Sequence, residues 1–151
     1  MLRSVKVRDY MSTNLITFKP ESDLFRAIDV LLKHNISGAP VIDHSGQLVG
    51  LLSEVDCLKS ILSGSYYDYE TLGGQVSEYM TTSVDVVDAG DDILAVSERF
   101  INERRRRFPV TENGQLVGQI SRKDVLRALK KFSSAEELHQ DKEQAQHYRS
   151  S

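Results

Sequence analysis

The sequence predicts an α/β (α+β) protein built from two copies of one β-α-β-β-α unit. Residues 46–50, Gly-Gln-Leu-Val-Gly, recur unchanged as residues 114–118, each within a longer matching stretch. In both stretches, short apolar runs alternate with helical patterns that have one apolar face. A repeat present only twice indicates a pseudo-symmetric pair, because an open solenoid needs three or more units. Each unit has only about 55–60 residues, so we expect the two units to share one core.

The first unit is predicted over residues 7–62 and begins with a strand at 15–18. Ser22 or Asp23 can cap the helix that follows. The apolar residues of this helix share one face: Leu24, Ala27, Ile28, Leu31 and Leu32. The remaining elements are an antiparallel hairpin of residues 39–42 and 48–52, and a helix from Ser53 with Val55, Leu58, Ile61 and Leu62 on one face.

The second unit is predicted over residues 76–132 and repeats this order. Asp91 or Asp92 can cap its first helix, whose inward residues are Ile93, Val96, Phe100 and Ile101. Its other elements are a strand at 84–87, strands around 109–111 and 116–120, and a helix from Ser121 with Val125, Leu129 and Phe132. Apolar faces on both helices of each unit imply that these helices cover the sheet and meet the other unit.

Two segments lie outside the units. The linker, residues 63–75, contains three tyrosines that either pin an ordered connection or stack on a ligand or a dimer mate: Tyr66, Tyr67 and Tyr69. The tail, residues 133–151, opens with a capping-box signature formed by Ser133 or Ser134 with Glu136 or Glu137. The rest of the tail is polar nearly all round, so we expect a partly formed or partner-dependent helix.

The composition is that of an ordinary globular chain, with 40% hydrophobic and 27% charged residues among 151. The net charge of -3 gives no general case for nucleic-acid binding. Cys57 is the single cysteine, which excludes an internal disulfide and fits a reducing compartment. No apolar stretch approaches the roughly 18 residues of a membrane span, so we expect a cytoplasmic protein without a membrane partner.

The third strand of each unit runs into the same Gly-x-x-Ser-x-x-Asp pattern: Gly50, Ser53 and Asp56, then Gly118, Ser121 and Asp124. One interpretation is structural, because Ser-x-x-Asp is a helix N-terminal box whose side chains satisfy free amides. The other is a binding site, because a helix N-terminus attracts phosphate and a carboxylate can accept two hydrogen bonds from a ribose diol. Duplication would copy a cap as faithfully as a site, so the pattern leaves both interpretations open.

Four adjacent arginines, residues 104–107, lie between the end of a predicted helix and the next strand. They can form a solvated turn or place cations at a helix C-terminus. Adjacent guanidiniums repel one another, however, and the two nearest the strand, Arg106 and Arg107, can instead grip phosphate oxygens. The first unit has Asn-Ile-Ser-Gly at residues 35–38, so phosphate binding would be unequal between the units.

The sequence predicts no catalytic activity. No nucleophile has an evident base beside it, and no Walker or Rossmann glycine pattern is present. Cys57 is interpreted as a packing residue. Surface or capping roles are predicted for the histidines, which lack metal-ligand spacing: His34, His44, His139 and His147.

These motifs resemble the tandem CBS-domain pair, often called a Bateman module, of the stand-alone bacterial type. The resemblance runs from Val7 to Leu129 and rests on three pairs of segments. They are the two Val-x-x-Tyr-Met-x-Thr openings, the stretches at 36–43 and 105–110, and the two Gly-Gln-Leu-Val-Gly-x-x-Ser-x-x-Asp segments. The resemblance implies two β-α-β-β-α units packed sheet to sheet about a pseudo-twofold axis, with two clefts between them.

The resemblance also implies a non-catalytic regulatory module, without a required cofactor, that binds AMP, ADP or ATP. Such a module would form a homodimer and signal to an effector protein. Its Asp124 cleft would hold adenine, ribose and phosphate with Leu15, Ile16, Ile36, Gly38, Pro40, Ser121, Asp124 and Arg106. Its Asp56 cleft would use Ser53, Asp56, Val84, Asp85, Arg107 and Pro109. Asp85 and Arg107 depart from the family's apolar and small residues, so we expect the Asp124 cleft to be the one that is filled.

Three other functions compete with a nucleotide sensor. A ligand-independent scaffold or dimerisation module would use the Ser-x-x-Asp segments only as helix caps. A module for S-adenosylmethionine would need fewer cations than residues 104–107 supply. Nucleic-acid binding through those arginines is the least favoured, because the surrounding chain is acidic and has no known nucleic-acid motif.

Overall fold

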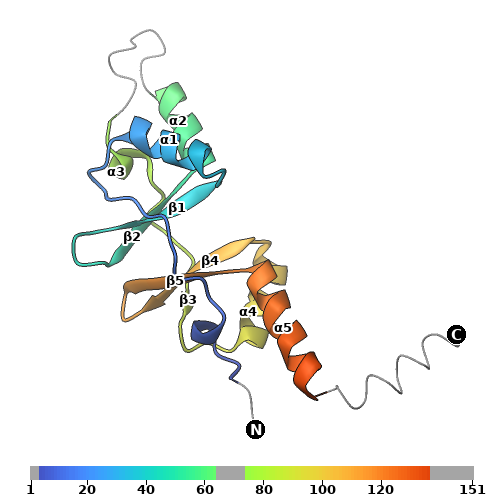
Figure 1. The fold of residues 1–151 in the computed structure, drawn as a ribbon. Coiled ribbons are helices and arrows are strands. Elements are labelled where there is room, and N and C mark those ends of the chain that lie inside the picture. The colour runs from blue at the N-terminus through green and yellow to red at the C-terminus, as the bar shows by residue number, and fades with distance from the viewer. Residues whose placement is uncertain (1–3, 64–73, 137–151) are drawn as a thin grey trace, which may run out of the picture.

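A computed structural model of the chain describes residues 4–63 and 74–136, and in it the protein is elongated (Figure 1). Two small sheets lie in the middle, with a pair of helices packed on each (Figure 1). The structure is therefore the predicted α/β arrangement of two similar halves. The predicted contacts of Tyr66, Tyr67 and Tyr69, and the tail beyond residue 136, lie outside the described residues.

The first half contains α1 (Leu24–Lys33), β1 (Gly38–Ile42), β2 (Leu48–Ser53) and α2 (Glu54–Ser63). α1 begins as predicted at Asp23, whose carboxylate accepts a hydrogen bond from the Arg26 amide at 3.1 Å. β1 and β2 form the predicted antiparallel hairpin. The predicted strand at 15–18 is reduced to a single parallel bridge between Phe18 and Val41, because this segment departs from the sheet toward the other half.

The second half contains β3 (Val87–Asp88), α4 (Ile93–Glu103), β4 (Arg107–Glu112), β5 (Gln115–Ser121) and α5 (Arg122–Glu136). β3 is shorter than the predicted strand at 84–87 and runs parallel to β4, which pairs antiparallel with β5. Asp92 caps α4 by accepting a hydrogen bond from the Leu94 amide. α5 continues through Ser133 and Ser134, so the prediction that one of them caps a new helix is wrong.

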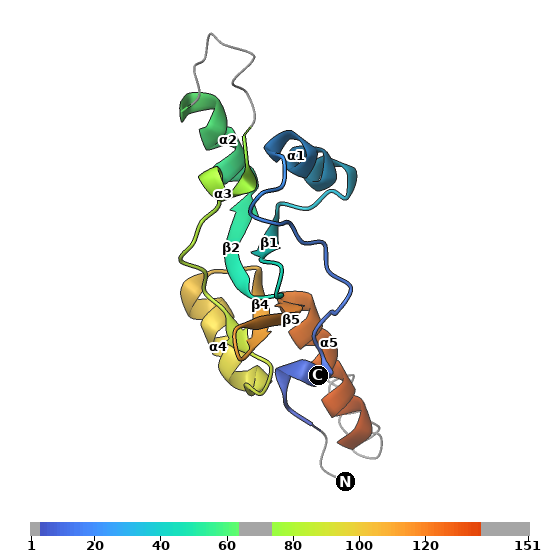
Figure 2. The ribbon, with the colours of Figure 1, turned by 90° about the vertical axis from the view of Figure 1, so that its left-hand side faces the viewer.

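The opening segment of each repeat packs on the half formed by the other repeat. Two short helices mark these segments, η1 (Val7–Asp9) and α3 (Val76–Tyr79). Each half has a hydrophobic core of its own, so the prediction of one shared core is wrong: Val7 is fully buried in the core of the second half, and Val76 is fully buried in the core of the first. Figure 2 shows η1 beside α5 and α3 beside α2. The packed halves therefore differ from the sequence repeats by an exchange of their first residues.

The two halves meet through paired contacts related by a pseudo-twofold axis. At the hairpin tips, the Leu48 amide donates to the Gly114 carbonyl and the Leu116 amide donates to the Gly46 carbonyl, both at 3.1 Å. Gly46 and Gly114 have φ angles of +87° and +80°, which favour glycine. Two further bridges obey the same pseudo-twofold relation and hold the exchanged segments in place, Leu51 with Thr81 in the first half and Ser12 with Gln119 in the second. The predicted sheet-to-sheet packing is thus formed by main-chain hydrogen bonds.

The helix faces agree with prediction only in part. Leu24, Ala27 and Leu31 of α1 and Ile93, Val96 and Phe100 of α4 are buried as predicted, but Leu32 is 73% and Ile101 is 75% exposed. In α2 the predicted apolar face is exposed: Val55, Leu58, Ile61 and Leu62. The buried face of α2 carries Asp56, Cys57 and Ser60 instead. The cause is the start of α2, because the Ser53 and Asp56 box fixes which side of the helix turns toward the sheet.

Candidate functional site

The larger of two cavities between the halves has a volume of about 610 Å³. Its walls come from the loop after η1, the start of β1, the start of β4 and the first turn of α5. The predicted residues of the Asp124 cleft that line it are Leu15, Ile16, Ile36, Gly38, Arg106, Ser121 and Asp124. Pro40, which was predicted with them, lines the smaller cavity. Residues from both repeats therefore come together at one hollow.

Sequence reasoning missed several polar residues of this cavity: Ser12, Asn14, Gln119, Arg122 and Lys123. Arg122 and Lys123 could have been predicted, because they lie between Ser121 and Asp124 in the Gly-x-x-Ser-x-x-Asp pattern. Ser12 and Asn14 gave no such signal, since they reach the cavity only through the crossing of the N-terminal segment to the second half. Arg107, predicted for the Asp56 cleft, lines both cavities.

Ser121 and Asp124 form a reciprocal box at the start of α5. The Ser121 amide donates to the Asp124 carboxylate at 2.9 Å, and the Asp124 amide donates to the Ser121 hydroxyl at 3.1 Å. Arg127 makes an ion pair with the same carboxylate at 3.1 Å from the exposed side of the helix. The Asp124 side chain remains 16% exposed and lines the cavity. The box therefore caps α5 and still presents carboxylate and hydroxyl oxygens to a ligand.

The first half contributes apolar residues to the lining of the larger cavity. Leu15, Ile16 and Ile36 are partly buried and line the cavity from the first half. A Cβ atom added at Gly38 would lie 2.9 Å from the Leu52 carbonyl oxygen, so only glycine fits this pairing of β1 with β2. The larger cavity is thus lined both by apolar side chains of the first half and by the polar first turn of α5.

The smaller cavity has a volume of about 350 Å³ and corresponds to the predicted Asp56 cleft. The predicted residues that line it are Ser53, Val84, Asp85, Arg107 and Pro109. Asp56 does not line it and is only 4% exposed. Its carboxylate accepts hydrogen bonds from the Ser53 amide and hydroxyl, each at 2.9 Å, and from the Thr81 hydroxyl at 3.2 Å. The structure thus gives Asp56 the role of a buried helix cap.

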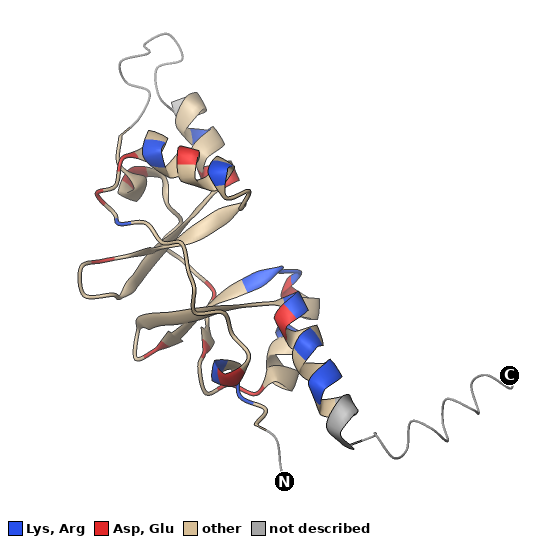
Figure 3. Ribbon diagram, in the orientation of Figure 1, with Lys and Arg blue, Asp and Glu red and all other residues tan. Residues whose placement is uncertain are grey.

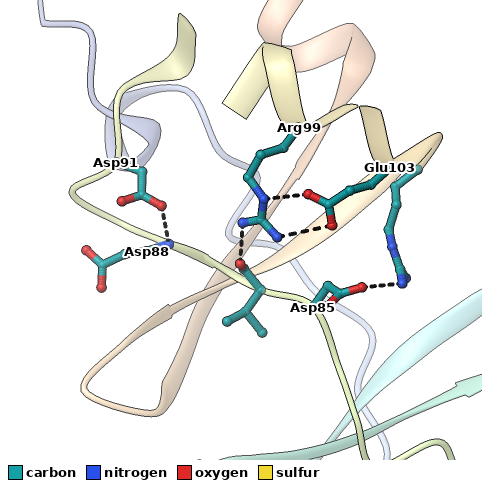
Figure 4. A network of polar contacts seen from close by, with 7 residues as sticks. Asp85, Asp88, Asp91, Arg99 and Glu103 are labelled. Atoms are coloured by element: carbon teal, nitrogen blue, oxygen red, sulfur yellow. Dashed lines mark hydrogen bonds and ion pairs between the residues drawn. The ribbon is translucent and has the colours of Figure 1, made fainter. Parts of the chain in front are cut away.

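Ion pairs form one wall of the smaller cavity (Figure 4). Asp85 pairs with Arg105, and both residues line the cavity. Glu103, which also lines it, accepts a hydrogen bond from Arg99 Nε at 2.7 Å. This bond raises the pKa of the Arg99 guanidinium and lowers the pKa of Glu103. Arg99 also donates to the Val86 carbonyl and lies 4.6 Å above the Phe108 ring, so it is fixed on several sides.

Cys57 fits the predicted role as a packing residue. It is 8% exposed in the core of the first half. Burial, together with the carboxylates of Asp56 and Glu54, raises the pKa of its thiol. The thiol is therefore protonated at neutral pH, which makes it a poor nucleophile.

Two further kinds of site were sought in residues 4–63 and 74–136. Within these ranges no three His, Cys, Asp or Glu side chains are grouped so that they could hold a metal ion. His139 and His147 lie outside them. None of the helices in the same ranges has the length and apolar character needed to cross a membrane.

Comparison with known proteins gives consistent matches. The chain matches the CBS domain twice, over residues 7–63 and 76–131. It is 32% identical over 123 residues to the uncharacterized protein MJ1225 of Methanocaldococcus jannaschii, which covers 82% of this chain and 42% of that protein. It is 28% identical to the methylated protein MJ0556 of the same organism, over 85% of this chain and 75% of that protein. The chain thus spans less than half of MJ1225.

Solved structures agree with this assignment. The crystal structure of CBSX2 in complex with AMP has a TM-score of 0.73 and 28% identity, and covers 86% of this chain and 99% of that chain. CBSX2 is a CBS-pair protein from Arabidopsis thaliana. Two family matches in one chain, with a fold shared over 99% of the crystallised CBSX2 chain, lead to one conclusion. This chain belongs to the CBS-domain family and is a tandem pair of CBS domains.

Proposed function

We propose that the chain is a non-catalytic regulatory module that binds an adenine nucleotide, AMP, ADP or ATP, in the larger cavity and signals to a partner protein. One observation carries the proposal. The larger cavity brings apolar side chains of the first half together with a carboxylate, a hydroxyl and several cations of the second half. A nucleotide has the same sequence of parts: an apolar ring, a ribose diol and phosphate.

Each part of a nucleotide has matching residues in the cavity. Adenine would pack between Leu15, Ile16 and Ile36, which supply an apolar surface of the right kind. The carboxylate of Asp124 can accept both hydrogen bonds of a ribose diol. Phosphate would lie near the Ser121 hydroxyl and the Arg106 guanidinium, since arginine binds phosphate oxygens through two parallel hydrogen bonds.

The comparison with CBSX2 supports an adenine nucleotide as the ligand. That protein was crystallised in complex with AMP, and the present chain shares its fold at 28% identity. S-adenosylmethionine carries a positive sulfonium in place of phosphate. The arginines that line the larger cavity therefore favour a phosphorylated ligand over S-adenosylmethionine.

The smaller cavity is proposed as a secondary site. Ser53, Val84, Asp85, Arg107 and Pro109 line it, but its ribose acceptor would have to be Asp56. The Asp56 carboxylate already accepts three hydrogen bonds within the protein. Asp85 also places a negative charge on the wall, where it pairs with Arg105. A nucleotide is therefore expected in the larger cavity first.

Signalling would follow from the position of the larger cavity between the halves. A ligand that contacts both halves favours one relative packing over another, by no more than its difference in affinity for the two. We propose that an effector protein reads this packing. We also propose a homodimer, because the exposed apolar residues of the helix pairs form faces suited to a second copy: Leu32, Leu62, Ile101 and Leu126.

Thermal unfolding with AMP, ADP, ATP and S-adenosylmethionine tests the proposal. Free nucleotide at 100 times its dissociation constant should stabilise the protein by about 2.7 kcal/mol. Asp124→Ala should abolish this gain, because it removes the ribose acceptor. Asp29→Ala removes an exposed carboxylate of α1 and is the matched control. No stabilisation by millimolar nucleotide in the folded protein would favour a ligand-independent scaffold instead.

Sedimentation velocity tests the homodimer separately. Leu32→Lys combined with Ile101→Lys changes two of the most exposed apolar side chains and should give a monomer. Their exposure means that the fold itself should tolerate both changes. A wild-type protein that is monomeric at high concentration would contradict the proposed dimer.

A further inference from the structure

We infer that the larger cavity selects adenine nucleotides with two or three phosphates over AMP. The inference rests on the proposed function, because it assumes that an adenine nucleotide binds there. The observation that carries it is the set of four cationic side chains that line this one cavity: Arg106, Arg107, Arg122 and Lys123. Figure 3 shows Lys and Arg concentrated at the start of β4 and along α5.

Among the described residues, these four cations have no acidic partner, unlike several arginines packed in the second half. Arg8, Arg99, Arg105 and Arg127 each form an ion pair with a carboxylate. Within residues 4–63 and 74–136, none of the four cavity cations does so. Arg122 is oriented by a hydrogen bond from its Nε to the Arg105 carbonyl at 2.6 Å. Its positive charge is therefore positioned but not neutralised.

The charge of the cavity wall exceeds what a single phosphate neutralises. The wall carries the four cations and one carboxylate, that of Asp124, which leaves a net charge of three positive units (four minus one). Asp124 is also engaged by Arg127 from outside. A phosphate monoester such as AMP carries about -1.5 to -2 at pH 7. Each further phosphate adds charge that the remaining cations can bind.

The equivalent helix of the first half shows that two of these cations are not needed for the fold. α2 has Glu54 and Val55 where α5 has Arg122 and Lys123. Cations in the first turn oppose the helix dipole, whereas Glu54 is favoured there. Arg122 and Lys123 therefore work against the stability of α5. A polyanionic ligand would explain this arrangement, because its negative charge offsets the unfavourable interaction of the two cations with the helix dipole.

The two cavities share a wall, which limits how many polyphosphates can bind. Arg106 and Arg107 line both cavities, together with Gly38 and Gln119. The smaller cavity is lined by Asp85 and Glu103 and by the four arginines at 104–107, so once the first ligand engages Arg106 and Arg107 its remaining charges balance and it does not attract a second polyanion. One ADP or ATP per chain follows from this sharing.

Isothermal titration calorimetry with AMP, ADP and ATP tests the inference, in EDTA so that Mg²⁺ does not neutralise the phosphates. ADP and ATP should bind at least about tenfold more tightly than AMP, with one molecule per chain. Arg122→Gln combined with Lys123→Gln should reduce this preference to about threefold or less, while AMP binding changes little. The preference should also shrink as salt is raised, because exposed charges are screened.

Lys33→Gln combined with Lys59→Gln is the matched control. It removes two exposed cations of α1 and α2 that line neither cavity, and it should leave the preference unchanged. Equal affinities for AMP, ADP and ATP, all lost in Asp124→Ala, would overturn the inference and leave the proposed function standing. Failure of all three nucleotides to bind would overturn both. Two ADP molecules per chain would contradict the shared wall.

Discussion

The two Ser-x-x-Asp boxes have the same spacing and the same place in their repeats, yet they differ in what surrounds them. Asp56 is buried and accepts the Thr81 hydroxyl, whereas Asp124 lines the larger cavity. Ser12, the counterpart of Thr81, lines that cavity too. A duplicated motif can thus serve as a cap in one half and as a ligand-facing group in the other. The neighbouring side chains decide which.

The largest expected effect separates the two aspartates by stability. Asp56→Ala should lower the free energy of unfolding by about 2–3 kcal/mol, because it leaves buried donors from Ser53 and Thr81 without an acceptor. Asp124→Ala should lower it by only about 1 kcal/mol, the typical loss of a helix cap. Urea titrations of both variants without ligand measure the difference. Equal losses would show that the two boxes are equivalent in the fold.

A second pair of variants tests the exchange of the opening segments between the two halves. Val7→Ala and Val76→Ala should each lower the free energy of unfolding by about 2 kcal/mol, since both valines are fully buried. Hydrogen exchange should show where the loosening occurs. Val7→Ala should expose amides of β4 and β5, and Val76→Ala those of β1 and β2. The reverse pattern would contradict the exchange.

A smaller effect is expected at Thr81. Thr81→Ala removes the hydroxyl that donates to Asp56 and should lower the free energy of unfolding by about 1 kcal/mol. Thr81→Ser keeps the hydroxyl and is the control. Ser12→Ala, at the counterpart position, should change stability by less than about 0.5 kcal/mol, because Ser12 faces the cavity. Chemical denaturation that ranks Ser12→Ala with Thr81→Ala would contradict the comparison.

The smallest effect concerns Cys57 and its counterpart Val125, and it depends on pH. Burial raises the pKa of Cys57 above its ordinary value of 9.0. The unfolded chain therefore releases the thiol proton first, so stability falls as pH rises from about 9 through the folded pKa. Cys57→Val should change the free energy of unfolding at pH 7 little, because the two side chains are similar in volume, and it should reduce this alkaline loss. Free energies of unfolding measured between pH 7 and 10 test both expectations. If the pH profile of Cys57→Val matches that of the wild type, another group causes the alkaline loss of stability.

Local features of the fold could be predicted from the sequence because their causes are local. Asp23 and Asp92 cap helices through hydrogen bonds to amides within three residues, and the hairpin tips need glycine. The buried face of α2 was harder to predict. Spacing identified Val55 and Leu58 as one apolar face, but both are exposed. Periodicity shows that residues share a side of a helix and does not show which surface covers that side.

The candidate site, like the fold, could be predicted from the sequence only in part. The larger cavity contains the apolar and polar residues that the family resemblance had predicted, except Pro40. The resemblance gave no sign that Thr81 engages Asp56 or that Arg105 pairs with Asp85. These contacts join residues far apart in the chain. The first joins the two repeats and the second joins residues 20 positions apart within one repeat, so neither follows from a local pattern or from the order of elements.

The exchange of Val7 and Val76 also bears on how such a chain arose. A molecule with a single unit would not bury this valine in its own core. The packing of its sheet and helices would therefore contain a gap. Two such molecules could complete each other by domain swapping, which is a low-cost route to a dimer. When the two copies are joined in one chain, their association becomes intramolecular and takes place at a high effective concentration. The interlocked halves have the arrangement that such a joined dimer would have.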